Sequence, residues 1–83
     1  MKILYFASIR ERLNRGEETV SPPASVATVA DLINWLGGRD EAAKLAFADR
    51  KAVRAAIDAE LVDHDASIAG AATVALFPPM TGG

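Results

Sequence analysis

The sequence predicts an α+β fold in which a mixed sheet carries one main helix packed on one face. Two segments rich in β-forming apolar residues stand near the ends of the chain, at residues 3–7 and 73–77. They are the most apolar of the expected strands, which favours pairing between them at the centre of the sheet. One amphipathic segment lies between them, at residues 28–36. The length of 83 residues suits a single small domain.

The N-terminal segment is predicted to form a strand, a helical turn and a second strand. Residues 3–7 are apolar on both faces, which is typical of a central strand covered on both sides. Residues 9–13 suit a helical turn, and residues 14–16 suit a tight turn because Asn and Gly tolerate positive φ. Residues 17–20 then form a second strand, which the prolines that follow bring to an end.

The main helix is predicted to begin after Thr28. The Thr28 hydroxyl can cap the helix, and Asp31 places a carboxylate in the first turn, where the helix dipole favours negative charge. Apolar residues recur at helical spacing and form one stripe: Val29, Leu32, Ile33 and Leu36. Gly37-Gly38 is expected to end the helix with a left-handed residue, and a second, shorter helix is expected within residues 41–48.

The C-terminal half is predicted to be mostly β-structure. Residues 53–58 place apolar side chains at every second position, as in a half-buried strand, and residues 60–62 follow as its hairpin partner. Residues 64–72 are expected to be a loop before the strand at 73–77. This order of elements is that of a β-grasp (ubiquitin-like) roll. We therefore expect one β-grasp domain, residues 1–79, followed by a flexible tail, residues 80–83.

Composition excludes several classes of function. The chain has no cysteine and one histidine, which excludes disulfides, cysteine-ligated metal centres, a cysteine nucleophile and a histidine-rich metal site. The net charge of −2 argues against nucleic-acid binding, which usually needs a basic surface. No apolar run approaches the ~18 residues of a membrane span, and no signal peptide is recognisable. We expect a cytoplasmic protein that binds neither nucleic acid nor membrane.

Several polar residues of the second half are predicted to be solvated. His64 stands among four carboxylates whose spacing matches no calcium loop, so no metal site is expected: Asp58, Glu60, Asp63 and Asp65. A basic patch is expected to be a solvated edge that prevents strand aggregation, with a docking role as the alternative: Arg50, Lys51 and Arg54. The aromatic residues are expected to fill the core: Tyr5, Phe6, Trp35, Phe47 and Phe77.

The C-terminus combines features that a frayed end does not explain. A strand of buried type leads directly into Pro78-Pro79, whose fixed φ angles stiffen the exit from the sheet. The four residues 80–83 extend at most ~14 Å, and the last two are glycines without side chains. Such a tail is thin enough to enter a narrow channel. Its terminal carboxylate is a poor electrophile, so chemistry at Gly83 would require ATP-dependent adenylation before a sulfur nucleophile attacks.

These residues resemble those of a known family. Residues 77–83 read Phe-Pro-Pro-Met-Thr-Gly-Gly and closely resemble the C-terminus of the sulfur-carrier subunits of molybdopterin synthase. Residues 3–11 look like the opening strand and turn of that family, and Thr28-Val29 looks like its helix start. The resemblance covers nearly the whole chain, and its specific part is the tail.

The resemblance implies a sulfur carrier whose reacting residue is Gly83. In the family, an E1-like adenylyltransferase uses ATP to activate the terminal glycine, and a sulfur donor enzyme supplies the sulfur of a thiocarboxylate. The carrier then gives this sulfur to cyclic pyranopterin monophosphate, in the active site of the large synthase subunit. The catalytic side chains belong to the large subunit, and no cofactor is bound permanently to the carrier.

The resemblance also implies which residues meet the partner. The working complex of the family is a heterotetramer with two copies of each subunit. Three tail residues would enter the large subunit together with Gly83: Met80, Thr81 and Gly82. Three residues before them would bind its surface: Phe77, Pro78 and Pro79. The chain departs from the family in two places, with Ala71-Ala72 where an acidic pair is common and Asp58 where Asn is common.

Three alternatives keep the fold and change the role. The chain is also compatible with a sulfur carrier for thiamine or another sulfur cofactor, with a ubiquitin-like modifier joined through Gly83 to lysines, or with an interaction domain whose tail is inert. In each case the sheet has more apolar surface than one main helix covers. We therefore expect an exposed apolar face, bordered by Phe77 and Pro78, that binds a partner.

Overall fold

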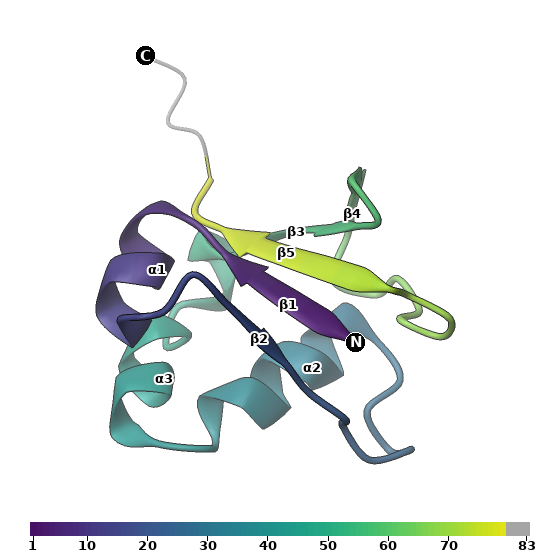
Figure 1. Ribbon diagram of the computed structural model, residues 1–83, viewed down its shortest axis with the longest axis horizontal. Helices are drawn as coiled ribbons and strands as arrows, with labels where there is room; N and C mark the ends of the chain where they lie inside the picture. Colours follow the sequence, from purple (N-terminus) through teal and green to yellow (C-terminus); the bar gives the residue numbers. More distant parts are fainter. Residues whose placement is uncertain (80–83) are drawn as a thin grey trace.

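Strands β1 (Lys2–Tyr5) and β5 (Thr73–Phe77) form the centre of the sheet in the computed structural model, which describes residues 1–79 (Figure 1). The two strands run parallel, and their register places Ile3 beside Val74 and Tyr5 beside Leu76. These four side chains are at most 1% exposed. The predicted pairing of the first and last strands is thus confirmed.

Three further strands complete a five-stranded mixed sheet. Strand β2 (Glu17–Thr19) lies antiparallel to β1 at one edge, and β3 (Arg54–Ile57) lies antiparallel to β5. Strand β4 (Glu60–Val62) pairs with β3 at the other edge, which gives the order β2-β1-β5-β3-β4. This topology confirms the predicted mixed sheet.

Helical segments cover one side of the sheet, to the left of and below the strands in Figure 1. Helices α1 (Ala7–Leu13) and α2 (Val29–Gly37) are followed by α3 (Glu41–Ala46) and the short 3₁₀ helix η1 (Arg50–Ala52). A capping box begins α2, since Thr28 accepts a hydrogen bond from the Asp31 amide and the Asp31 carboxylate accepts one from the Thr28 amide. The predicted apolar stripe of α2 is buried.

Several details of the sequence prediction are wrong. The first strand ends at Tyr5, and Ala7 begins α1 with a φ of 51°. The strand is not covered on both sides: Leu4 is half-buried, and Phe6 is 46% exposed because the helices pack on the opposite face. Gly38 is right-handed, with a φ of −86°.

Two expectations about the core also need correction. Of the aromatic residues, Tyr5 and Phe47 are buried, whereas Trp35 and Phe77 are half-buried and Phe6 is exposed. The expected loop at residues 64–72 contributes Ile68, which is 5% exposed, to the core. The backbone of this loop also pairs with the start of α2 through a Thr28–Ser67 bridge, which explains why the segment is ordered without being a strand.

Glu18 connects three segments at the helical side of the sheet. Its carboxylate accepts a 2.6 Å hydrogen bond from the Tyr5 hydroxyl and forms ion pairs with Arg39 at 2.8 Å and Arg15 at 3.2 Å. The Arg39 guanidinium also lies over the Trp35 ring, 5.4 Å from its centroid. Burial opposes the charged form of Glu18, but the hydrogen bonds from Tyr5 and Arg39 outweigh it and lower the pKa of the carboxyl.

We predict that Tyr5→Phe lowers the free energy of unfolding by about 1–2 kcal/mol near pH 7, because it removes a hydrogen bond to a charged group. The folded-state pKa of Glu18 lies below its ordinary value of 4.5. The charged network therefore stabilises the fold fully above that value and less as the pH falls through the folded pKa. Urea unfolding should show that Tyr5→Phe lowers the free energy of unfolding by less at about pH 3 than near pH 7.

A matched control is Glu17→Gln, which removes an exposed carboxylate from the same strand. Glu17 pairs with Lys2 at 3.2 Å, and both side chains are at least half exposed. Its loss should change the free energy of unfolding by less than about 1 kcal/mol. If Tyr5→Phe lowered the free energy of unfolding equally at both pH values, the charge on Glu18 would not contribute to stability.

Candidate functional site

The side of the sheet opposite the helices is apolar, and we call it the outer face. Its first row crosses four strands, because Leu4 pairs with Ala75, Ala75 with Ala56, and Ala56 with Leu61. Paired residues project from the same face of a sheet, so these four side chains lie side by side. Phe77 follows Ala75 by two residues along β5 and therefore projects from the same face.

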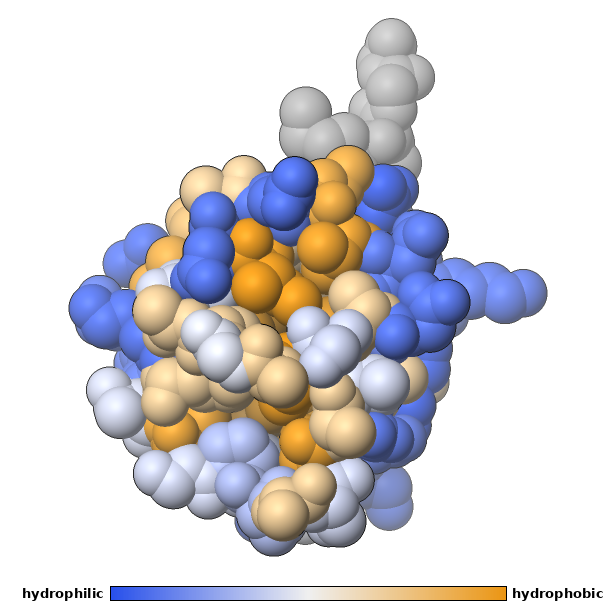
Figure 2. Space-filling model, turned by 90° about the vertical axis from the view of Figure 1, so that its right-hand side faces the viewer, coloured by the Kyte–Doolittle hydropathy of each residue, from blue (hydrophilic) through white to orange (hydrophobic). Residues whose placement is uncertain are grey.

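Much of the outer face is open to solvent. Leu61 is 58% exposed and Phe6, which follows β1, is 46% exposed. The other three residues of the first row are half-buried: Leu4, Ala75 and Ala56. Figure 2, which faces the right-hand side of Figure 1, shows hydrophobic residues gathered below the grey atoms and flanked by hydrophilic residues. An apolar surface that continues over four strands is typical of a protein–protein contact. The exposed apolar face predicted from the sequence is therefore present.

The chain leaves the sheet directly beside this face. Phe77, Pro78 and Pro79 are half-buried, as expected for residues that border the outer face. The end of β5 is held by β1, since the Phe6 amide donates to the Leu76 carbonyl at 3.2 Å. The two prolines then fix φ where the chain exits. Gly83 and the three tail residues Met80, Thr81 and Gly82 lie outside the described residues, as does the predicted flexible tail.

Asp58 and His64 have structural partners. Asp58 accepts hydrogen bonds from the amides of Ala72, at 3.2 Å, and Thr73, at 2.9 Å, and so ties the β3–β4 turn to the start of β5. His64 Nε2 lies 2.7 Å from the Val53 carbonyl oxygen. Within residues 1–79, no group of three or more potential ligands converges on a point where a metal ion would bind.

The basic patch is not at an edge of the sheet, and that expectation is wrong. Arg54 opens β3, which pairs with β5 on one side and with β4 on the other. Arg50 and Lys51 lie in η1, immediately before it. Within residues 1–79, β3 is an interior strand of the sheet, so these cations do not stand on an edge strand.

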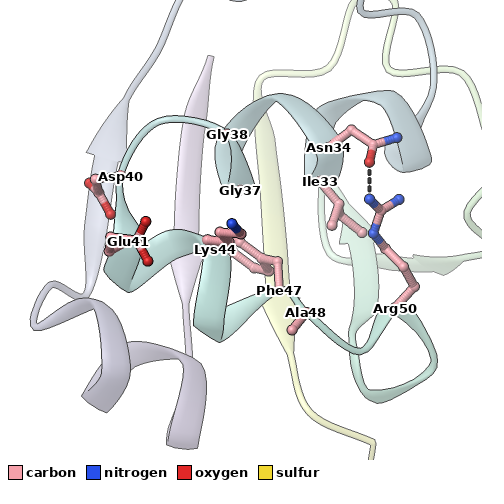
Figure 3. Close-up of a pocket in the computed structure, with 10 residues that line it drawn as sticks. All are labelled: Ile33, Asn34, Gly37, Gly38, Asp40, Glu41, Lys44, Phe47, Ala48 and Arg50. Carbon is pink, nitrogen blue, oxygen red and sulfur yellow. Dashed lines mark hydrogen bonds between the residues drawn. The ribbon is translucent and has the colours of Figure 1, made fainter.

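A separate cavity of about 630 Å³ opens on the helical side of the molecule, between α2, α3 and η1 (Figure 3). Lys44 and Phe47 line it, and the Arg50 guanidinium donates to the Asn34 side-chain oxygen at its border. Of the predicted site residues that the structure describes, Phe77, Pro78 and Pro79, none lines it. We therefore place the functional site at the outer face and the exit of the tail.

Sequence reasoning does not single out Phe6 and Leu61, the two large apolar residues that are exposed on the outer face. Phe6 continues an apolar run, which predicts a core position for it. Leu61 stands in a short hairpin strand between Glu60 and Val62, where two adjacent apolar residues do not show which of them is exposed. The usable signal was period-2 alternation: Leu4 and Phe6 share a face that Ile3 and Tyr5 do not.

Comparisons with known proteins identify the family and the fold. A family model described as the ThiS family matches residues 3–83. The chain is 34% identical over 83 residues to the molybdopterin synthase sulfur carrier subunit of Escherichia coli, with 100% of this chain and 99% of that protein covered. This match confirms the resemblance inferred from the C-terminal segment.

Two solved structures share the fold. SAMP1 from Haloferax volcanii superimposes with a TM-score of 0.72 at 25% identity, over 100% of this chain and 98% of that one. A protein from Pyrococcus furiosus, described as subunit 1 of a molybdopterin converting factor, gives a TM-score of 0.70 at 27% identity over 95% of both chains. The predicted β-grasp fold is thus confirmed. Among the described residues, no helix is both long and apolar enough to cross a membrane.

We predict that zinc and calcium leave the melting temperature unchanged. Asp58 and His64 already bind backbone groups, and a metal that bound only the folded state would raise the melting temperature. Differential scanning fluorimetry with each metal, before and after addition of a chelator, measures this. A rise in melting temperature that the chelator reverses would contradict the prediction.

Proposed function

The chain belongs to the ThiS family, and from that premise we propose that it is the sulfur-carrier subunit of a molybdopterin synthase. The observation that carries this proposal is the full-length match to the Escherichia coli sulfur carrier subunit. The family match extends to Gly83 and so includes the tail that would react. The outer face beside the exit of the tail supports the proposal physically, because a carrier has to dock on its partner before it can deliver its sulfur.

The proposed chemistry takes place at the carboxylate of Gly83. An oxygen of the carboxylate attacks the α-phosphorus of ATP on an E1-like partner, and pyrophosphate leaves. Hydrosulfide delivered by a donor enzyme then attacks the acyl carbon, AMP leaves, and a thiocarboxylate remains after loss of a proton. The thiocarboxylate sulfur attacks a carbon of cyclic pyranopterin monophosphate and displaces the oxygen substituent there, which gives a thioester. Water then cleaves the acyl C–S bond, so the sulfur stays on the pterin and Gly83 returns to the carboxylate.

The carrier supplies no catalytic side chain in this scheme and keeps no cofactor. The absence of side chains at Gly82 and Gly83 lets the acyl group reach a reaction centre inside the partner, and Met80 and Thr81 enter the channel behind them. The rate gain comes from holding the sulfur at the pterin, which is a proximity effect. The proposal places the protein in the cytoplasm, where ATP is available to the activating partner.

The outer face is the proposed docking surface for the large subunit, in a heterotetramer with two copies of each chain. Phe77, Pro78 and Pro79 lie where the apolar face and the root of the tail meet, so a partner that buries this face also receives the tail. Phe6 and Leu61 extend the contact across the sheet. Burial of such exposed apolar surface is the usual source of affinity at an interface core.

We predict that deleting Gly83 leaves the fold intact and abolishes sulfur loading and transfer. The deletion moves the carboxylate back by roughly 3.5 Å, which exceeds the tolerance of a reacting group. Gly82→Leu should also fail, because it adds a side chain within the channel. With ATP, the E1-like partner and a sulfur source, the intact mass of the unaltered chain should rise by one oxygen-to-sulfur exchange that maps to Gly83.

The same experiment separates the alternatives. Molybdopterin formation by the Gly83 deletion would contradict the carrier proposal and favour an inert tail. Isopeptide-linked products in place of a thiocarboxylate would favour a protein modifier. Thiocarboxylate formation without transfer to the pterin precursor would favour a carrier for thiamine or another sulfur cofactor.

We predict that Leu61→Ser weakens binding to the large subunit by about tenfold or more, whereas its effect on stability stays within about 0.5 kcal/mol. Leu45→Ser is the matched control, because Leu45 is 63% exposed, close to the 58% of Leu61, but lies on α3 at the helical side. Isothermal titration calorimetry with the purified large subunit measures both. Equal affinities for the two variants would contradict docking through the outer face.

A further inference from the structure

A cluster of cations stands at the corner of the outer face where the tail begins. It consists of Arg50 and Lys51 in η1 and Arg54 at the start of β3, and all three residues are exposed. Together with Val62 and His64 they line a shallow cavity of about 280 Å³. We call these three residues the basic cluster.

The charges of the basic cluster have no ionic partner among residues 1–79. The three ion pairs found among residues 1–79 involve Lys2, Arg15 and Arg39, and none involves the cluster. The Asp49 carboxylate accepts a hydrogen bond from the Lys51 backbone amide at 3.1 Å, and Asp63 lines the same cavity. Arg50 donates to the neutral side-chain oxygen of Asn34, so its charge is also uncompensated.

Register places Arg54 next to the proposed docking contact. Arg54 pairs with Phe77, so its side chain projects from the outer face beside that ring. Phe77 is the last residue of β5, and Pro78 follows it where the chain leaves the sheet. A partner that buries Phe77 must therefore also cover the Arg54 guanidinium. Removing an unpaired guanidinium from water is unfavourable unless an anionic group meets it.

We propose that the basic cluster is a second docking element, which binds carboxylate side chains on the protein that covers the outer face. The planar guanidinium of Arg54 suits a bidentate bond to one Asp or Glu of the partner. Lys51 and Arg50 stand further from the apolar face and act over a longer range, by attracting an acidic surface before contact. The inference rests on the proposed function, because it assigns charge complementarity to the same docking surface.

Charge reversal of the cluster tests the proposal against a matched control. Lys51→Glu/Arg54→Glu should lower the association rate constant with the purified large subunit by about tenfold at low salt, and the difference should largely vanish at high salt. Lys44→Glu/Arg12→Glu makes the same change in net charge on α3 and α1, at the helical side, and should alter the rate by less than about twofold. Stopped-flow or surface plasmon resonance at two salt concentrations measures this.

Arg54→Gln isolates the short-range contact, since it keeps most of the side-chain length and removes the charge. It should mainly accelerate dissociation, because truncating a buried charge pair acts on the dissociation rate. If both cluster variants match the control while Leu61→Ser still weakens binding, the basic cluster is not a docking element and the proposed function stands. If the unaltered chain does not bind the large subunit at all, the proposed function and this inference both fail.

Discussion

The parallel pairing of β1 with β5 is the constraint on which the rest of the structure depends. Among residues 1–79 it is the pairing between the strands most distant in sequence, so it depends on the placement of all the elements between them. Its inward side chains, including Tyr5 and Leu76, are buried against the helices, and its outward ones form the middle of the outer face. The same register sets the point at which Pro78 leaves the sheet.

The two sides of the sheet differ in role. The helices cover one side of the sheet and stabilise it, which leaves the other side apolar and available to a partner (Figure 1). The tail starts at the boundary between β5 and this open side, next to Phe77 and Arg54. The domain therefore supplies binding and orientation, while the reaction itself needs only a glycyl carboxylate and the catalytic groups of other proteins.

Local sequence features predicted the elements well, and long-range placement less well. The helix cap at Thr28 and the apolar, β-forming runs of the terminal strands are local signals, and both match the structure. The left-handed start of α1 at Ala7 had no local signal, since alanine rarely adopts a positive φ. The contact of Glu18 with Tyr5 and Arg39 joins three distant segments, and the position of Arg54 inside the sheet depends on strand order. Neither is encoded in a short window of sequence.

A single-turnover transfer reaction tests the central claim most directly. The protein is prepared with a thiocarboxylate at Gly83, for example by intein cleavage with sulfide, and mixed with the purified large subunit and cyclic pyranopterin monophosphate. The account predicts that dithiolene product forms without ATP, while the intact mass of the carrier returns to that of the carboxylate. Unmodified carrier should give no product. Persistence of the thiocarboxylate in the presence of the large subunit and the pterin would contradict the account.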